Sequence, residues 1–437
     1  MPVETHFHIE PGGALTGRIR VPGDKSISHR SVMLGAICEG TTRVSGFLEG
    51  ADCVATIAAF RQMGVRIDGP TGGRVEIEGV GLHGLHPPQA PLDLGNSGTS
   101  MRLLSGLLAG QRFDSVLLGD KSLSKRPMGR VMEPLSSMGA HIVGTETGTP
   151  PVRITGGHQL QGIHYRLPMA SAQVKSCLLL AGLYASGETC VEEPAPTRDH
   201  TERMLEALEY PVARSDGSVC VRGGGTLQAR DIQVPSDISS AAFFLVGASI
   251  APGSDLLLEQ VGMNPTRTGV VDILRLMGAD IEILELQHVA GEPIADIRVR
   301  AAPLRGIRVP EHLVPLAIDE FPAVFVAAAC AEGETVVTGA EELRVKESDR
   351  IQVMADGLKC LGVDARPAPD GIVIRGGSVN GGEIDSHGDH RIAMAFAIAG
   401  LRASAPVRIL DCGNVATSFP DFGRIAVESG LRLGKEL

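Results

Sequence analysis

Basic and hydroxyl-bearing residues gather in this sequence where extended stretches turn into helix-like ones. The stretch VPGDKSISHR places Lys25, Ser26 and Arg30 behind a Pro-Gly turn and before an apolar run. The start of a helix leaves about four backbone N–H groups unpaired and carries partial positive charge, so a cation there is locally unfavourable. A bound anion removes that conflict and accepts hydrogen bonds from the free N–H groups. The pattern therefore predicts an anion-binding site.

Other cations follow the same pattern along the chain. The cations in or near such segments are Lys25, Arg30, Arg102, Lys121, Arg126, Arg198, Lys346, Arg350 and Arg391. The tetrapeptide GDKS occurs at 23–26 and 119–122, and neither copy fits the P-loop pattern GxxxxGK[ST], so nucleotide binding through a P-loop is not predicted. A solvated turn is the simpler explanation of one copy taken alone, but the whole set of cations favours an anion site.

Composition and charge exclude several classes of function. The net charge of −11 and the lack of Trp argue against nucleic acid as a partner, but not against a small anion in a local basic pocket. No apolar run reaches the ~18 residues of a membrane span, and the stretch MPVETHFHIE lacks the pattern of a secretion leader. We therefore expect a cytoplasmic protein that binds neither nucleic acid nor membrane.

The cysteines are scattered singly and form no CxxC pair. They are Cys38, Cys53, Cys177, Cys190, Cys220, Cys330, Cys360 and Cys412. This spacing favours free thiols in a reducing cytoplasm over disulfides or a zinc site.

One structural unit recurs along the chain. An extended apolar stretch meets a Gly-, Ser- or Asp-rich segment, an Ala- and Leu-rich helix, a strand, and an amphipathic helix that ends in a glycine. The helix-start segments are 22–30, 95–102, 168–176, 235–242, 317–324 and 386–393, and the glycine endings are QMGV, SMGA, LMGA and CLGV. A fixed period outranks local assignments, so six units of strand, helix, strand, helix and strand are predicted. At 437 residues, two globular clusters of three units are expected, with a crossover at 233–237.

The same segments carry a resemblance. PGDKSISHRS, LGNSGTSMRLL, KRPMGR, MASAQVKSCLLLAGL, IDEFPAVFVAAACAEGET, LRVKESDR and SHGDHRIAMAFAIAG resemble the enolpyruvyl transferases, and among them the class II branch of the 5-enolpyruvylshikimate-3-phosphate synthase family. They span nearly the whole chain. The family implies an α/β fold with two domains, each an inside-out α/β barrel of three βαβαββ units, that close over a cleft. Here the domains are expected at 1–21 plus 236–437 and at 22–235.

The resemblance implies a reaction in the shikimate pathway, which leads to the aromatic amino acids. The enolpyruvyl group of phosphoenolpyruvate passes to the 5-hydroxyl of shikimate 3-phosphate, and phosphate leaves after a tetrahedral intermediate. By the same resemblance, Asp319 is the base near the 5-hydroxyl and Glu347 the proton donor to the methylene carbon. Glu320 is the nearest competitor for either role, and helix capping is the structural alternative for Asp319.

The resemblance also implies the substrate contacts. For shikimate 3-phosphate they are Lys25, Ser26, Arg30, Ser171, Ala172, Gln173, Arg198, Asp319 and Lys346. For phosphoenolpyruvate they are Lys25, Asn96, Gly98, Arg126, Gln173, Arg350 and Arg391. Arginine suits these anions because its planar guanidinium can donate two parallel hydrogen bonds to a carboxylate or phosphate.

Three positions bear on how the family pattern carries over. Many relatives have a second serine where Ala172 stands, and a lysine at the place of Thr417. Relatives with alanine in place of Gly98 are less sensitive to glyphosate, which occupies the phosphoenolpyruvate site. Gly98 therefore predicts a sensitive enzyme.

The family implies a monomer without a cofactor or metal. His387, Asp389 and His390 are residue types that bind metals, but Arg391 beside them repels a divalent cation, so no metal is predicted there. A UDP-N-acetylglucosamine enolpyruvyl transferase is the nearest alternative; such enzymes open with Lys-Asn where this chain has Lys25-Ser26, and use a loop cysteine absent from residues 95–130. An RNA-end-processing protein built from the same repeat and an inactive binding module are the other two.

Overall fold

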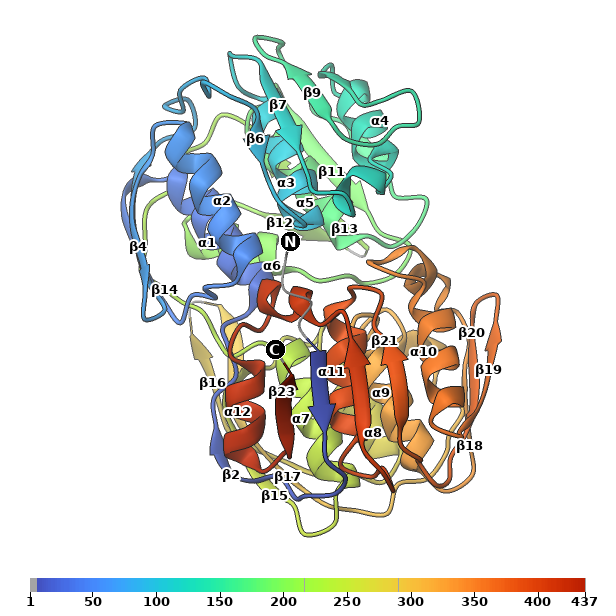
Figure 1. The fold of residues 1–437 in the computed structure, drawn as a ribbon. Coiled ribbons are helices and arrows are strands. Elements are labelled where there is room, and N and C mark those ends of the chain that lie inside the picture. Colours follow the sequence, from blue (N-terminus) through green and yellow to red (C-terminus); the bar gives the residue numbers. More distant parts are fainter. Residues whose placement is uncertain (1–5, 216, 290, 437) are drawn as a thin grey trace. The chain divides into compact units, whose positions relative to one another are not determined.

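The computed structural model describes residues 6–215, 217–289 and 291–436. The chain divides into two compact units (Figure 1). Unit 1 comprises Met1–Pro22, Pro235–His288 and Glu292–Leu437, and unit 2 comprises Gly23–Val234 with Val289–Gly291. Each unit is built from helices and mixed sheets, so the predicted α/β class is confirmed.

Unit 2 contains three four-stranded sheets among its described residues. Its helices are α1 (Lys25–Ala36), α2 (Ala51–Gln62), α3 (Gly98–Ala109), η1 (Leu123–Lys125), α4 (Gly129–Ser137), α5 (Ala172–Gly182) and α6 (His200–Ala207). The first sheet has the order β14 (Ile232–Gln233), β3 (Glu39–Ser45), β5 (Arg74–Val80), β4 (Arg66–Thr71). The second has the order β6 (Leu92–Asp93), β7 (Ser115–Leu118), β9 (Val152–Thr155), β8 (His141–Val143). The third has the order β10 (His164–Arg166), β11 (Glu188–Glu192), β13 (Ser218–Arg222), β12 (Ala213–Ser215).

Unit 1 likewise contains three sheets among its described residues. Its helices are α7 (Ile238–Ile250), α8 (Gly269–Leu276), η2 (Glu311–Leu313), α9 (Phe321–Cys330), η3 (Glu341–Val345), α10 (Arg350–Cys360), α11 (His390–Ala399), η4 (Gly413–Thr417) and α12 (Phe422–Ser429). One sheet has the order β21 (Gly382–Asp385), β22 (Val407–Leu410), β1 (His6–Ile9), β23 (Leu433–Glu436). Another has the order β16 (Asp280–Val289), β17 (Glu292–Arg300), β15 (Asp255–Gly262), β2 (Thr16–Ile19). The last has the order β18 (Glu334–Val337), β20 (Gly371–Arg375), β19 (Asp364–Ala368).

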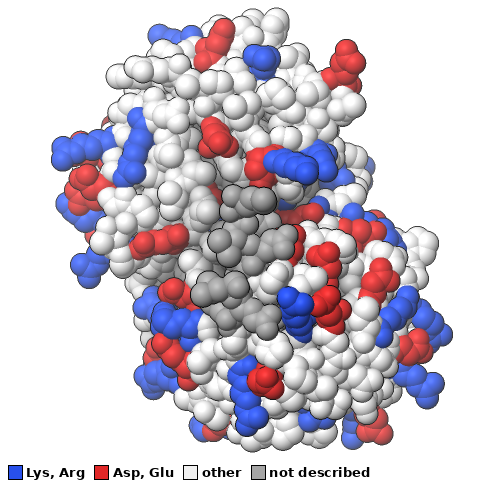
Figure 2. Space-filling model, viewed as in Figure 1, with Lys and Arg blue, Asp and Glu red and all other residues white. Residues whose placement is uncertain are grey.

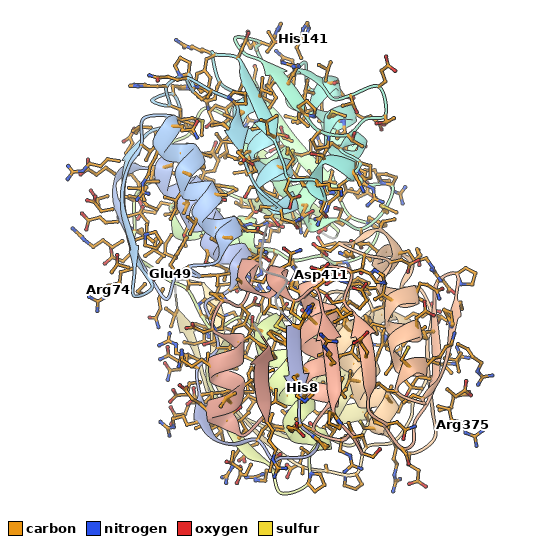
Figure 3. All side chains as sticks on the ribbon, in the orientation of Figure 1. His8, Glu49, Arg74, His141, Arg375 and Asp411 are labelled. Atoms are coloured by element: carbon orange, nitrogen blue, oxygen red, sulfur yellow. A yellow bond between two sulfur atoms is a disulfide. The ribbon has the colours of Figure 1, made fainter. Side chains whose placement is uncertain are left out.

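Each unit has its own hydrophobic core. In unit 1 the helices α7, α9 and α11 pack against one another and are buried almost all round, because their sequences are runs of Ala, Val, Ile and Phe. In unit 2 the corresponding core helices are α1, α3 and α5, of which α3 and α5 lie closest together. The apolar side chains fill the space between these helices and the sheets (Figure 3).

The predicted helix starts are confirmed at all six segments. Helices α1, α3, α5, α7, α9 and α11 each begin inside one of them. Five of the six starts are capped by a side chain, as where Asp24 Oδ1 accepts from the backbone N–H of Ile27 at 2.8 Å. The predicted glycine endings follow α2, α4, α8 and α10, and Gly64, Gly139, Gly278 and Gly362 all have positive φ. Glycine is favoured there because a side chain is strained in that conformation.

The sheets of the described residues are open. Each has a linear strand order with two edges, so none of the six closes into a barrel. In each sheet of unit 2, one parallel pair is followed by two antiparallel pairs. The predicted α/β class is thus observed, whereas a closed barrel is not seen in this part of the chain.

The prediction that all cysteines are free thiols is wrong for one pair. Cys190 on β11 and Cys220 on β13 form a disulfide. They are directly opposite each other in the antiparallel register, with 4.1 Å between their Cα atoms. Their separation of 30 residues in the sequence conceals this, because only strand pairing brings them together. Within the described residues, helices long and apolar enough to cross a membrane are absent.

Acidic and basic side chains are interspersed on the face of the molecule in Figure 2. Many are exposed ion pairs, such as Arg298 with Asp255 at 2.6 Å and Arg408 with Glu383 at 2.9 Å. Exposed pairs of this kind contribute little because water screens them. Buried ion pairs are therefore the better indicators of a functional site.

Candidate functional site

Arg350 joins three carboxylates of unit 1. Its side chain is 1% exposed and opens α10. Nε donates to Asp389 Oδ2 at 2.8 Å, one Nη donates to Glu347 Oε2 at 2.6 Å, and the other Nη lies 3.5 Å from Asp319 Oδ1. Segments that are far apart in the sequence therefore meet at one guanidinium.

The charges at Arg350 are locked in by their neighbours. Burial alone would lower the pKa of the Arg350 guanidinium, but the carboxylates of Asp389, Glu347 and Asp319 raise it above its ordinary value. Burial would likewise raise the pKa of Asp389, but Arg350 holds it below its ordinary value. Both groups are therefore charged at neutral pH.

Lys346 lies on the other side of the Asp319 carboxylate. Its Nζ is 3.3 Å from Asp319 Oδ1 and 2.8 Å from Glu342 Oε1. Burial alone would lower the pKa of Lys346, but Asp319 and Glu342 raise it above its ordinary value. The Asp319 side chain is 15% exposed, so its carboxylate sits between two cations with one side open.

Arg391 completes this group at the start of α11. It donates from Nη to the backbone carbonyl of Asp319 at 2.9 Å. Asp389 accepts from its backbone N–H at 2.9 Å and so caps α11 as well as binding Arg350. The residues Asp319, Lys346, Glu347, Arg350 and Arg391 are called the unit 1 cluster below.

The structure distinguishes Asp319 from Glu320. Glu320 is 1% exposed, accepts a hydrogen bond from Ser239 Oγ, and lies 4.0 Å from Arg267. It occupies the N-cap position of α9 but makes no capping hydrogen bond through its side chain. Asp319 is the more exposed carboxylate and faces Lys346 and Arg350, so it is better placed to reach a substrate.

In unit 2, Lys25 and Arg30 differ in accessibility. Lys25 opens α1, is 23% exposed, and its Nζ lies 2.5 Å from Asp52 Oδ2. Arg30, one turn later, is 4% exposed and donates to Thr201 Oγ1 at 2.7 Å and to Ser176 Oγ at 2.8 Å. A third hydrogen bond of 3.0 Å runs from Arg30 to the backbone carbonyl of Ser26. Arg30 thus ties α1 to α5 and α6, while Lys25 remains partly open to solvent.

Two arginines meet at the start of α3. One Nη of Arg126 donates to Asn96 Oδ1 at 3.1 Å, and Arg102 donates to Gln173 Oε1 at 2.5 Å. A methyl group placed on Gly98 would lie 3.0 Å from Arg126 Nη1 and 3.3 Å from Arg102 Nη1. These residues are called the unit 2 cluster below: Asn96, Gly98, Arg102, Arg126 and Gln173. Arg102 was recognised in the sequence only as a cation near a helix start, with no role assigned.

The remaining predicted contacts of unit 2 flank helix starts. Ser171 caps α5 through a 3.4 Å bond from the backbone N–H of Val174, and Ala172 and Gln173 follow it. Ser26 follows Lys25 on α1, and Arg198 precedes α6; both are partly exposed. Helix N-termini, cations and hydroxyls together provide donors suited to phosphate and carboxylate groups.

His29 is buried beneath this region and is expected to make unit 2 sensitive to acid. Its Nδ1 lies 2.8 Å from Thr56 Oγ1, which links α1 to α2. Burial, with Lys25 and Arg30 nearby, holds the pKa of His29 well below 6.5. When the pH falls below about 6.5, the unfolded chain takes up a proton that the folded chain refuses, so stability falls by at most about 1.4 kcal/mol per pH unit.

The measurement for His29 is the free energy of unfolding between about pH 5 and 7.5. His29→Gln should reduce the slope below about pH 6.5, whereas His141→Ala should leave it unchanged. His141 is exposed at the edge of unit 2 (Figure 3). An unaltered slope in His29→Gln would show that other groups cause the acid sensitivity.

Comparisons with known proteins agree with the site. A family model described as EPSP synthase (3-phosphoshikimate 1-carboxyvinyltransferase) matches residues 9–425. The chain is 70% identical over 425 residues to the 3-phosphoshikimate 1-carboxyvinyltransferase of Methylococcus capsulatus, with 97% of each chain covered. It is 67% identical over 428 residues to that of Alkalilimnicola ehrlichii, which covers 98% of this chain and 96% of the relative.

Solved structures agree in fold. An EPSP synthase from Acinetobacter baumannii superposes with a TM-score of 0.90 at 60% identity, covering 99% of this chain and all of the other. The enolpyruvyl transferase NikO from Streptomyces tendae has a TM-score of 0.80 at 16% identity, covering 100% of this chain and 99% of the other, which shows a shared fold. The chain belongs to the EPSP synthase (3-phosphoshikimate 1-carboxyvinyltransferase) family.

Proposed function

We propose that this protein transfers the enolpyruvyl group of phosphoenolpyruvate to the 5-hydroxyl of shikimate 3-phosphate and releases phosphate. Family membership supports the reaction, and the observation that carries it is the unit 1 cluster. There, two carboxylates stand among cations that are charged at neutral pH. Both substrates are anions, and the reaction needs a proton acceptor and a proton donor.

The proton steps follow from the chemistry of the two substrates. Asp319 accepts the proton of the 5-hydroxyl as its oxygen bonds to C2 of phosphoenolpyruvate. Glu347 delivers a proton to C3, which gives a tetrahedral adduct. Phosphate then leaves from C2, and C3 loses a proton, so the enol double bond is restored in the product. Lys25 neutralises the charge of the phosphate groups.

Residues of both clusters are proposed to hold the substrates. Those assigned to shikimate 3-phosphate are Lys25, Ser26, Arg30, Ser171, Ala172, Gln173, Arg198, Asp319 and Lys346. Those assigned to phosphoenolpyruvate are Lys25, Asn96, Gly98, Arg126, Gln173, Arg350 and Arg391. Arg102 joins the second set, because it lies beside Gly98 and bonds Gln173.

The experiment that tests this function is a coupled assay of phosphate release. Phosphate should appear when shikimate 3-phosphate and phosphoenolpyruvate are mixed with the protein, and not with either alone. UDP-N-acetylglucosamine in place of shikimate 3-phosphate should give no phosphate. Release with the nucleotide sugar would favour the alternative transferase, and no release with either acceptor would favour an inactive binding module.

Gly98→Ala is expected to weaken binding of phosphoenolpyruvate and of glyphosate. The added methyl meets the ends of Arg126 and Arg102 at 3.0 and 3.3 Å, so these guanidinium groups must shift while the backbone can stay. A rise of about tenfold in the KM for phosphoenolpyruvate corresponds to roughly 1.4 kcal/mol of lost binding. The inhibitory concentration of glyphosate should rise at least as much.

The matched control is Gly129→Ala at the start of α4. A methyl there meets only Glu133 Oε1, at an ordinary distance of 3.5 Å. It should leave both values unchanged. Equal inhibition curves for wild type and Gly98→Ala would contradict the steric explanation.

We also propose the finer architecture: six copies of one βαβαββ unit, three in each of two domains with boundaries at residues 21–22 and 235–236, each domain an inside-out barrel. The recurrence of one parallel and two antiparallel pairs in the sheets of unit 2 supports a repeat. A cytoplasmic monomer remains the expectation, and sedimentation would test the oligomeric state.

A further inference from the structure

Three potential metal ligands form a row across the third sheet of unit 2. His164 on β10 is directly opposite Cys190 on β11, and Cys190 is directly opposite Cys220 on β13. Residues directly opposite each other in a sheet project to the same face. The row is therefore a consequence of strand register.

This row lies on the face of the sheet that is turned away from α5. On the other face, Val191 and Val221 are buried in the core, and Gly182 of α5 closely approaches Thr189 and Val221. Alternation along β11 places Cys190 on the outer face with Glu188. The predicted substrate contacts Ser171, Ala172 and Gln173 belong to α5, so the row is separate from them.

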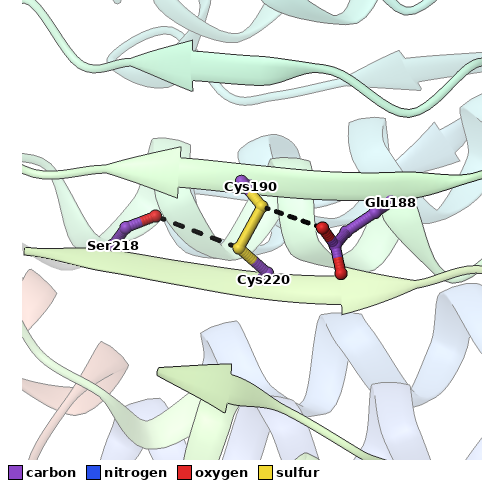
Figure 4. The surroundings of a disulfide bond; sticks show 4 residues. All are labelled: Glu188, Cys190, Ser218 and Cys220. Carbon is purple, nitrogen blue, oxygen red and sulfur yellow. Dashed lines mark hydrogen bonds between the residues drawn. A yellow bond between two sulfur atoms is a disulfide. The ribbon is translucent and has the colours of Figure 1, made fainter. Parts of the chain in front are cut away.

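The ligand atoms of the row are close together. One atom each of His164, Glu188 and Cys190 lies within 4.8 Å of the others. Glu188 Oε2 is 3.7 Å from Cys190 Sγ, and Cys220 Sγ is bonded to the latter (Figure 4). His164 and Glu188 are exposed, so a metal ion can reach them. Sulfur, imidazole nitrogen and carboxylate oxygen are the ligands of protein zinc sites.

The disulfide decides whether the row can bind a metal. A sulfur in a disulfide is not a thiolate, and the thiolate is the ligand form. A dithiol reductant would break the Cys190–Cys220 bond, supplying two electrons and two protons while it becomes a disulfide itself. Two thiolates at a tetrahedral zinc stand about 3.8 Å apart, given Zn–S bonds of about 2.3 Å, so the sulfurs must separate. Side chains of directly opposed residues have room for this, since their Cβ atoms are typically about 4.5–5.5 Å apart.

We propose that the reduced protein binds one Zn²⁺ through Cys190, Cys220, His164 and Glu188, and that the disulfide excludes this ion. Binding displaces the two thiol protons to solvent. The two states are mutually exclusive ways to join β11 to β13, one by a covalent bond and one through a metal. The site lies in unit 2, and the proposal does not depend on the transferase reaction.

The test compares the full chain after oxidation and after reduction by a phosphine. Each form is mixed with excess Zn²⁺, freed of unbound metal, and its zinc is measured with a chromogenic chelator. The reduced form should hold one more zinc per chain than the oxidised form. Equal zinc contents would overturn the proposal. Co²⁺ is the second probe, since two thiolates give it a charge-transfer absorption in the near ultraviolet.

Matched variants assign the ligands. Cys220→Ser and His164→Ala should each weaken zinc binding by the reduced protein by about tenfold or more, and Glu188→Gln should weaken it less. Cys220→Ser should also remove most of the Co²⁺ charge-transfer absorption. The controls are Cys360→Ser at another exposed cysteine, His141→Ala at another exposed histidine, and Glu192→Gln on the same strand.

The controls should bind zinc like the wild type. His164 and Glu188 are exposed, so their variants will fold even if Cys220→Ser does not. Undiminished zinc binding in His164→Ala, or equal loss in His141→Ala, would show that the ion binds elsewhere and would overturn the assignment.

Discussion

Asp319→Asn should lower kcat by roughly 10²–10⁴-fold, because it removes the proposed proton acceptor for the 5-hydroxyl. The amide oxygen can still accept hydrogen bonds from Lys346 and Arg350, which lie 3.3 and 3.5 Å from the carboxylate. The fold and the KM values should therefore change much less than kcat. Steady-state phosphate release at saturating concentrations of both substrates is the measurement.

The matched control for Asp319→Asn is Glu342→Gln. Glu342 is the other carboxylate paired with Lys346, at 2.8 Å, but its side chain is 40% exposed and has no proposed role in proton transfer. Its variant should keep kcat within a few fold of wild type. Equal losses in the two variants would mean that the charge of Lys346, and not the Asp319 carboxylate, limits the reaction.

Arg350→Met should cost about 3–5 kcal/mol in the free energy of unfolding, the usual penalty for leaving a buried carboxylate without its partner. Asp389 is fully buried and its carboxylate receives two hydrogen bonds from Arg350, at 2.8 and 3.2 Å. Denaturant unfolding of the two proteins at neutral pH is the measurement. The same variant should also lose phosphoenolpyruvate binding.

Two further variants test whether the lost partner is the cause. Arg366→Met removes an exposed ion pair with Glu334 in the same unit and should cost less than about 1 kcal/mol. Adding Asp389→Asn to Arg350→Met removes the buried charge while keeping a residue that can cap α11, so part of the stability should return. A double variant no more stable than Arg350→Met would locate the cost in lost packing.

The local features of this fold could be predicted from the sequence. A helix start depends on residues within one turn, such as Asp24 with Ile27, and a helix end depends on one glycine with positive φ. Both signals are therefore readable from a short stretch of chain. The anion chemistry was also readable, because cations at helix starts are unfavourable without a ligand.

The partners of each side chain could not be predicted in the same way. Arg350 and Asp389 are 39 positions apart, Arg102 and Gln173 are 71 apart, and the disulfide spans 30. Nothing in the local sequence states which distant segment will pack beside a given helix start. For this reason Arg102 received no role and the cysteines were taken as free thiols.

By itself, the sequence determined the α/β class, the six helix starts and the kind of ligand. These depend on backbone hydrogen bonds and charges whose partners lie a few residues away. The tertiary structure alone decided which carboxylate stands open between Lys346 and Arg350, because burial of Glu320 against Ser239 is set by packing of α9 on α7. Strand register likewise placed Cys190 opposite Cys220, since a shift by one residue would turn one of them to the other face.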